Sequence, residues 1–271
     1  MSSGTGPVLL GVALVDLGIA LGAAGFAALL HPIRWLGLPT RRRAAVALLL
    51  AVLAGLAGVL LPSPEVRAPA IVSALDRFAP RWQFSEHHEV VVHASPDAVL
   101  RAAREVTAGE IRLFRTLTWI RRPHLGDERE SILAAPAEKS LIDVALGSGF
   151  FLLAEEPGHE IVIGSLVIVP AALRHLSAAE RAQRKVELSP EVFRTLEDPG
   201  YAKASMNFAV RPLGDGSSLL ATETRVEATD DATRLRFGAY WRLIYPGSAL
   251  IRVNWLDAIR RRTEAAPALR P

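Results

Sequence analysis

The start of the chain holds two long apolar segments with almost no polar positions. Pro7–Leu30 carries one ionisable residue, Asp16, and Ala44–Leu61 carries none. A helix needs roughly 20 apolar residues to cross the hydrocarbon core of a bilayer. Both segments are about this long, so the pattern predicts a transmembrane hairpin over residues 1–61, with spans at about 8–30 and 44–61.

Small residues recur along one side of each predicted span. Small side chains let two helices approach closely inside a membrane, where no hydrophobic force draws helices together. We therefore predict a tight antiparallel hairpin; the alternative is that Gly and Ala are simply abundant in this sequence. The small residues are Gly11, Gly18, Gly22 and Gly25 in the first span and Ala44, Ala47, Ala51, Gly55 and Gly58 in the second.

Two questions about the first span stay open: the role of Asp16, and whether the segment is a cleaved signal peptide. A carboxylate inside a membrane is a functional candidate, but Asp16 comes early and lies near one surface if the span is Val12–Leu30. A cleaved signal peptide is the alternative for the whole segment, yet Met1–Gly6 has no Lys or Arg, and a second span follows at once. We expect a retained hairpin with Asp16 close to headgroup water.

The connection between the spans, His31–Arg43, is basic and contains no acidic residue. Loops rich in Lys and Arg stay in the cytoplasm, so we expect the 31–43 loop there and both termini outside. Trp35 is a suitable interface anchor for this loop. The loop cations are Arg34, Arg41, Arg42 and Arg43, and the cations after the second span, which favour the opposite orientation, are Arg67, Arg77 and Arg81.

Prolines mark residues 62–85 as a linker between the hairpin and the rest of the chain. Within this linker, apolar residues recur at helical spacing, at Ile71, Val72, Leu75 and Phe78. A short amphipathic helix of this kind either lies on the membrane surface or docks on the domain that follows. The pattern leaves both arrangements open.

Alternating and helical patterns then follow one another through a domain at residues 86–264. Ser95-Pro96-Asp97 starts a helix that runs to about Val106, and a capping-box pattern at Thr107–Glu110 starts a second, short helix. Alternation predicts strands at Glu86–Ala94, Phe150–Ala154, Glu160–Val169, Tyr201–Arg211 and Ser218–Glu227. Further helical segments are Glu138–Leu146 and the polar stretch Ala171–Lys185.

The last element is a long helical pattern that follows Asp231 and runs to about Thr263, with residues 265–271 left as a tail. Pro246-Gly247 interrupts the pattern, so we expect a kink or two helices end to end. The fold class predicted for the whole chain is α+β, with two transmembrane helices before the domain.

Composition narrows the chemistry open to this domain. The chain has 271 residues and a net charge of +3. It contains no cysteine, and this absence excludes disulfides and thiolate metal sites. The arginines are scattered or flank the spans, so they indicate solubility and lipid headgroups and no nucleic-acid partner. His87 and His93 share a strand face but stand six residues apart, too far to bind one ion. We find no motif for a metal, a phosphate or another cofactor, and we expect none.

The order of a strand, two short helices, antiparallel strands and a long final helix resembles the helix-grip fold of the START-like, SRPBCC-type superfamily. The resemblance covers roughly Glu86–Glu264, about two thirds of the chain, while the hairpin and the Ala171–Lys185 insertion depart from the common core. Stretches that resemble one bacterial branch of unassigned function are Phe150–Gly164, Pro199–Lys203, Glu223–Val226, Tyr240-Trp241, Pro246–Ser248 and Ile251-Arg252.

The resemblance implies a curved antiparallel sheet that grips the last helix, with an apolar cavity between sheet and helix. Members of the superfamily bind lipids, sterols and polyketides, and some act as cyclases, aromatases or hydrolases. The candidate cavity residues in this sequence are Met206, Phe208, Glu223, Arg225, Phe237, Tyr240 and Trp241.

The sequence leaves open which way Glu223 and Arg225 point and whether the aromatic stripe lines the cavity. Glu223 and Arg225 share one face of the last predicted strand, and Thr222 and Thr224 share the other. If the charged face points inward, the two form a polar pair in the cavity; otherwise they are an exposed or structural pair. The aromatic stripe that includes Tyr240 is either core or cavity wall.

The leading hypothesis is a membrane-tethered binding protein for a hydrophobic small molecule or lipid. It would sit in the inner (plasma) membrane of a bacterium, with the domain outside the cytoplasm. One alternative is a cyclase- or hydrolase-like enzyme that uses Glu223, Arg225 or Tyr240. Another is a structural or regulatory partner of other membrane proteins.

Overall fold

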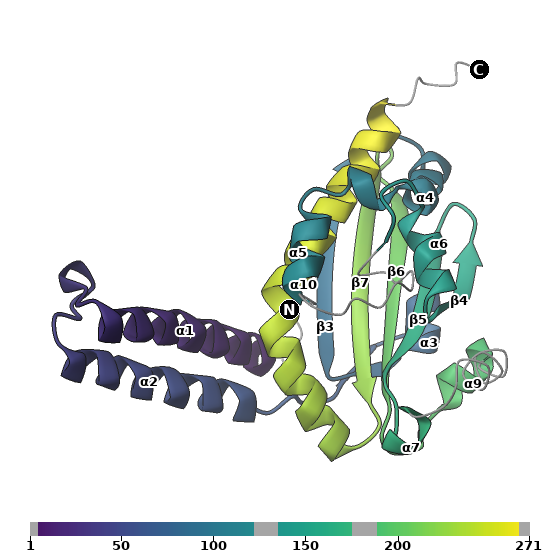
Figure 1. The fold of residues 1–271 in the computed structure, drawn as a ribbon. Coiled ribbons are helices and arrows are strands. Elements are labelled where there is room, and N and C mark those ends of the chain that lie inside the picture. The colour runs from purple at the N-terminus through teal and green to yellow at the C-terminus, as the bar shows by residue number, and fades with distance from the viewer. Residues whose placement is uncertain (1–4, 122–134, 175–188, 266–271) are drawn as a thin grey trace.

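A computed structural model describes residues 5–121, 135–174 and 189–265 of the chain. Over these ranges the protein is α+β: an apolar helical hairpin, an antiparallel sheet and a long C-terminal helix (Figure 1). The predicted fold class is confirmed at this level.

Two helices, α1 (Thr5–Leu30) and α2 (Arg41–Leu60), lie side by side in the hairpin (Figure 1). A 3₁₀ turn at Arg34–Leu36 connects them. Both helices are long and apolar enough to cross a membrane, as predicted. Glycines bring them close together, because a Cβ atom on Gly18 would lie only 2.9 Å from the carbonyl oxygen of Ala51.

Five antiparallel strands make the main sheet, in the spatial order β3–β7–β6–β5–β4. All five predicted strands are present. The first begins two residues earlier than predicted, because Phe84 still pairs with Val226. The strands are β3 (Phe84–Val92), β4 (Phe150–Glu156), β5 (Glu160–Ile168), β6 (Ala202–Pro212) and β7 (Ser218–Ala228).

Short helices surround the sheet. They are α4 (Pro96–Glu105), the 3₁₀ helix η2 (Ala108–Glu110), α5 (Phe114–Arg121), α6 (Leu141–Gly147), α7 (Ala171–Arg174) and α9 (Pro190–Thr195). Thr107 and Glu110 form the predicted capping box. Of the helix predicted at 171–185, the first four residues form α7, and residues 175–185 lie outside the described part of the chain. Most of the predicted tail lies outside it as well.

The C-terminal helix α10 (Asp231–Ala265) is one unbroken helix of 35 residues that contains Pro246. It runs along the sheet and changes direction near its middle, as Figure 1 shows. A proline inside a helix removes one hydrogen bond and crowds the preceding turn. The structure therefore has the kink, and the alternative of two separate helices is wrong.

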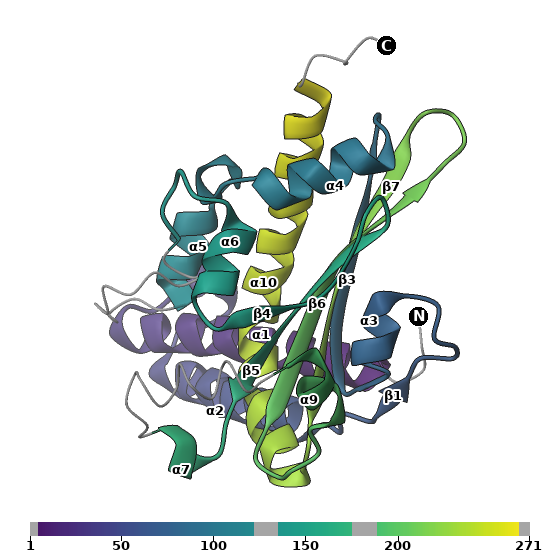
Figure 2. The same ribbon diagram turned by 90° about the vertical axis from the view of Figure 1, so that its right-hand side faces the viewer.

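Helices cover the inner face of the sheet and part of the outer face, and different helices pack on each. The inner face packs against α10, and toward one end of the strands also against α4; Phe208, Leu100 and Trp255 belong to this core. The outer face packs against α3 (Ala74–Phe78) and α9, where Val162 and Phe193 are buried. Figure 2 shows α10 on one side of the strands and α3 on the other. Neither face of the sheet is simply solvent-exposed.

The linker helix α3 docks on the sheet, as in the second of the two arrangements predicted for residues 62–85. Ser73 and Asp76 form its capping box, and Leu75 is fully buried against the outer face. The helix is shorter than the apolar pattern predicted, since Ile71 and Val72 precede it and are exposed. A small ribbon of β1 (Val66–Arg67) and β2 (Arg81–Trp82) flanks α3.

Candidate ligand-binding cavity

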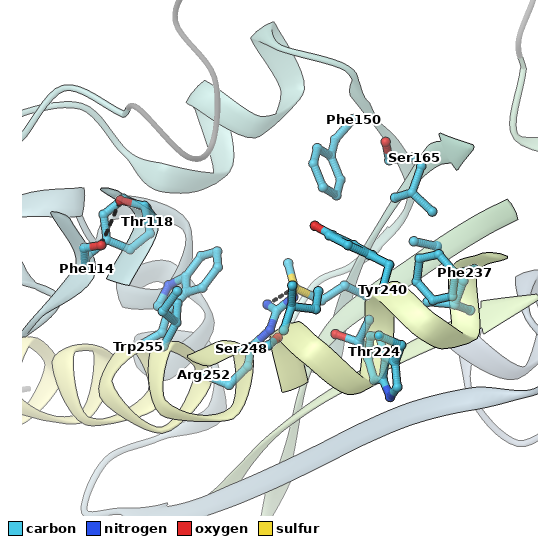
Figure 3. A pocket seen from close by; sticks show the side chains of 17 residues that line it. Phe114, Thr118, Phe150, Ser165, Thr224, Phe237, Tyr240, Ser248, Arg252 and Trp255 are labelled. Carbon is cyan, nitrogen blue, oxygen red and sulfur yellow. Dashed lines mark hydrogen bonds between the residues drawn. The ribbon is translucent and has the colours of Figure 1, made fainter. Parts of the chain in front are cut away.

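A cavity of about 330 Å³ lies between the inner face of the sheet and α10 (Figure 3). Side chains from paired residues of β5, β6 and β7 form its floor. Ser165, Ala204 and Val226 stand side by side on β5, β6 and β7, and Met206 and Thr224 form the next row. Because side chains alternate along a strand, residues two apart on each strand meet on this face.

The aromatic stripe of α10 forms one wall. Phe237, Tyr240, Trp241 and Ile244 recur at helical spacing before Pro246, and all four line the cavity. Phe237 and Trp241 also pack against Phe84 of β3, with ring centroids 5.1 and 6.1 Å from its own. The stripe is therefore both core and cavity wall, because Phe237 and Trp241 pack against the sheet while all four residues border the empty volume.

Beyond Pro246, α10 contributes a more polar stretch: Ser248, Ile251, Arg252 and Trp255. The Arg252 guanidinium contacts the sulfur of Met206 and lies 5.4 Å from the centre of the Trp255 ring. Such stacking places a cation beside an aromatic face. Arg252 thus brings a positive charge to a cavity whose walls are otherwise mostly apolar.

The remaining wall comes from outside the sheet and α10. Phe114 and Thr118 of α5 and Phe150 of β4 lie across from α10 in Figure 3. The Thr118 hydroxyl donates to the carbonyl oxygen of Phe114 at 2.8 Å, so its polarity is already satisfied. This wall therefore presents apolar surface to the cavity.

Three buried polar atoms in cavity-lining residues lack a hydrogen-bond partner in the described part of the chain. They are Oγ1 of Thr224 and Nε1 of Trp241 and Trp255. A buried polar atom without a partner costs roughly 1–3 kcal/mol. Any molecule that reaches these atoms with a suitable polar group gains a hydrogen bond that the protein alone leaves unmade.

A buried carboxylate, Glu86 of β3, lies behind the cavity wall and is held by the cavity residue Ser248. Ser248 donates to one of its oxygens at 2.8 Å, and Nε2 of His88 lies 2.8 Å from the other. Tyr245 lies nearby, and its burial together with the negative charge of Glu86 raises the pKa of its phenol. Sequence reasoning missed Glu86, because it comes at the start of a strand whose other acids are exposed.

Four of the predicted cavity residues line the cavity: Met206, Phe237, Tyr240 and Trp241. The prediction for Phe208 is wrong. Phe208 shares the face of Met206 but lies one row further along β6, where it packs edge-on against Trp255 at 5.0 Å. The core that Phe208 belongs to fills that end of the inner face, so no empty volume remains beside its ring.

Glu223 and Arg225, which were candidates either for the cavity or for a structural pair, do not line the cavity, because both side chains project from the outer face. Arg225 donates to Asp76 of α3 at 2.7 Å, to the carbonyl oxygen of Ala79 at 3.0 Å and to Glu223 at 2.7 Å. Its guanidinium stacks 4.0 Å from the ring centre of Trp82. The pair therefore fastens the linker to the sheet.

Charge compensation around Arg225 shifts the pKa values of both partners. Burial alone would raise the pKa of Asp76, but hydrogen bonds from Arg225, Ser73 and the backbone of Val72 outweigh burial and lower it. Burial likewise opposes the charge on Arg225, while Glu223 and Asp76 raise its pKa. Both groups are thus held in their charged forms. Because Glu223 and Arg225 lie outside the cavity, the enzyme hypothesis loses two of the three residues on which it depended.

Three histidines, His87, His88 and His93, lie beside acidic residues. His87 lies 3.5 Å from Glu89, and His93 lies 3.1 Å from Glu264. Among the described residues, no group of three or more His, Asp or Glu side chains is placed to hold a metal ion.

Comparisons with family models, with curated proteins and with solved structures find no match for this chain. The cavity and its surroundings are therefore the basis for any functional conclusion.

Proposed function

We propose that this protein is a membrane-tethered binding protein for a hydrophobic small molecule or lipid, which occupies the cavity between the sheet and α10. The cavity itself carries the proposal. Its volume of about 330 Å³ falls in the range of ligand pockets, roughly 300–1,000 Å³. Apolar walls with a few polar groups suit a molecule that is mostly hydrocarbon.

The polar groups suggest how such a ligand is oriented. The Thr224 hydroxyl and the indole N–H groups of Trp241 and Trp255 have unused hydrogen-bonding capacity. The hydrocarbon part of the ligand would contact Phe114, Phe150 and the aromatic stripe. The Arg252 guanidinium lines the same cavity and would meet a hydroxyl or carbonyl on the ligand, so an amphipathic molecule fits better than a pure hydrocarbon.

Membership of the helix-grip, SRPBCC-type superfamily is part of the same proposal. In its support, a long C-terminal helix lies across an antiparallel sheet, and in the described residues the short helical segments α4, η2, α5 and α6 lie between the first two strands of that sheet. The cavity lies between that helix and the sheet, where the resemblance implies one. This likeness is one of element order, and the ligand class still rests on the cavity.

The hairpin would place the cavity next to a source of apolar ligands. Its two helices are suited to span a bilayer, and we propose that they anchor the domain in the inner (plasma) membrane of a bacterium. With the arginine-rich 31–43 loop in the cytoplasm, the domain lies outside the cytoplasm.

The test is to purify the full chain from membranes and identify bound apolar molecules by native mass spectrometry and solvent extraction. Ala204 lies on the cavity floor, so Ala204→Phe should fill the cavity and reduce ligand occupancy roughly tenfold or more. Ala221→Phe is the matched control, because Ala221 is on β7 but faces the opposite side of the sheet from Thr224.

The proposal predicts that the wild-type chain and Ala221→Phe carry the same ligand and that Ala204→Phe does not. A wild-type chain that carries no apolar molecule would contradict the proposal. So would an Ala204→Phe chain with full occupancy, because the ligand would then be bound elsewhere.

A further inference from the structure

The outward side of α10 carries a row of exposed apolar residues, Leu235, Leu243, Leu250 and Val253, with side chains 42 to 58 % exposed. Their spacing of eight, seven and three residues keeps them on one side of a helix. The cavity-lining residues of α10 are on the opposite side. We call this row the α10 apolar row. Exposed apolar residues gathered in one place mark an interaction surface.

The hairpin is attached to the same helix. Arg242, which is buried, donates from Nη2 to the carbonyl oxygen of Leu61 at 2.7 Å and to the Ser63 hydroxyl at 3.1 Å. Only a glycine fits where α1 passes this side chain, since a Cβ on Gly11 would lie 2.3 Å from the Arg242 Nε. Val8 at the start of α1 is buried in the same cluster as Trp241. The hairpin is therefore seated on α10 and is not a loose tether.

The exposed apolar surface of the hairpin continues up to its contact with α10. Leu10 and Leu60, next to the residues that contact Arg242, are 54 and 69 % exposed. Leu235 of the α10 apolar row shares a small hollow with Leu60. In Figures 1 and 2, the loop end of the hairpin lies on the opposite side of α10 from the sheet. Lipid that surrounds the hairpin would thus meet α10 as well.

We propose that the α10 apolar row lies on the membrane surface, inserted among the lipids of the leaflet next to the domain. This inference rests on the proposed function only in taking the hairpin to span the membrane. An amphipathic helix at an interface buries its apolar side roughly 5–10 Å into the boundary between headgroups and acyl chains. Arg236 is exposed beside Leu235, where a cation would meet lipid phosphates.

The cavity comes close to this surface. Tyr240 lines the cavity and is 41 % exposed, and it stands three residues before Leu243 on the helix. Residues three apart are neighbours on a helix surface. The cavity wall at Tyr240 therefore adjoins the lipid-facing side of α10, and a ligand could pass from leaflet to cavity without crossing water.

The test uses the full chain in lipid nanodiscs of phosphatidylcholine and phosphatidylglycerol. The chain has no cysteine, so a single introduced cysteine carries an environment-sensitive fluorophore. Leu243→Cys and Leu250→Cys report on the α10 apolar row, Phe26→Cys on the hairpin, and Leu213→Cys on an exposed turn between β6 and β7. Quenching by lipids that carry a nitroxide near the headgroup and by lipids that carry one deep in the acyl chain is measured for each.

The proposal predicts quenching of the Leu243 and Leu250 probes by the shallow nitroxide, quenching of the Phe26 probe, and none at Leu213. If Phe26 is quenched while Leu243 and Leu250 behave like Leu213, the hairpin spans the membrane but α10 does not lie on it. The α10 apolar row is then free for another protein, and this inference is overturned alone. If Phe26 is not quenched either, the membrane tether fails, and this inference fails with it.

Discussion

At the residue scale, neighbouring side chains on β7 have different roles, because successive residues of a strand point to opposite faces of the sheet. Thr224 faces the cavity, while Glu223 and Arg225 on either side of it face the linker. Arg225 has two carboxylates, one carbonyl oxygen and the Trp82 ring around its guanidinium. A buried cation with its hydrogen bonds satisfied in this way holds neighbouring elements together, and removing one partner is costly.

We predict that Asp76→Asn destabilises the protein by about 2 kcal/mol at neutral pH, because Arg225 loses a charged partner. The matched control is Glu191→Gln, which breaks an exposed pair with Arg194 and should leave stability almost unchanged, because water screens exposed charges. Thermal unfolding of the detergent-solubilised chain measures both. Equal effects of the two substitutions would show that burial adds nothing to the Asp76 pair.

The same pair gives a pH dependence with a definite sign. The pKa of Asp76 is lowered in the folded state, so its stabilisation is complete above the ordinary value of about 3.9 and is lost as pH falls through the lower folded pKa. The wild-type chain should therefore lose more stability than Asp76→Asn as the pH falls below about 4. Parallel stability curves for the two chains over this range would contradict the assignment.

At the element scale, the hairpin depends on glycines placed where the helix backbones approach. A Cβ on Gly18 would lie 2.9 Å from the Ala51 carbonyl oxygen and 3.1 Å from the backbone nitrogen of Gly55, whereas a Cβ on Gly55 would meet nothing within 4 Å. The two glycines thus differ in role although both belong to the same small-residue pattern.

We predict that Gly18→Ala forces α1 and α2 apart and destabilises the hairpin by on the order of 1–2 kcal/mol, as overpacking does elsewhere. Gly55→Ala should be neutral or slightly stabilising, since alanine has the higher helix propensity. Unfolding in mixed micelles with increasing denaturing detergent compares the two. If both variants unfold like the wild type, the close approach at Gly18 does not hold the hairpin together.

At the scale of the whole molecule, the hairpin and the domain behave as one oriented unit. Arg242 binds the end of α2, and Val8 of α1 lies in a core cluster of the domain. The side of the membrane that holds the hairpin's ends therefore also holds the cavity and the α10 apolar row. In the proposed orientation, the basic 31–43 loop lies in the cytoplasm, and the cavity lies on the other side of the membrane.

We predict that alkaline phosphatase fused after Pro271 is active in a bacterial host and that green fluorescent protein fused there is dark. A truncated chain that ends with the same fluorescent protein after Arg43 is the control and should be bright, because the 31–43 loop is expected in the cytoplasm. The reverse pattern would place the domain and its cavity in the cytoplasm, with the membrane contact of α10 unchanged but on the inner leaflet.

Much of the fold was predictable from local pattern, and part of the cavity was not. The spans, all five strands and the long last helix follow from apolar periodicity, which reflects the fixed geometry of strand and helix. Met206, Phe237, Tyr240 and Trp241 were placed correctly. Phe208 was misplaced because it shares a face of β6 with Met206. The Trp255 ring packs against it at that end of the cavity, and the sequence pattern does not show this contact.

By itself, the sequence determined the type and order of the main elements, and which residues share a side of each, because these depend on neighbours along the chain. It did not determine which side of β7 faces α10, since both faces of the sheet bury apolar residues and both carry polar residues. That choice depends on Asp76, far away in the chain, which reaches Arg225 only once α3 has docked. Tertiary structure decided it because burial, and not periodicity, selects the partner of a charged side chain.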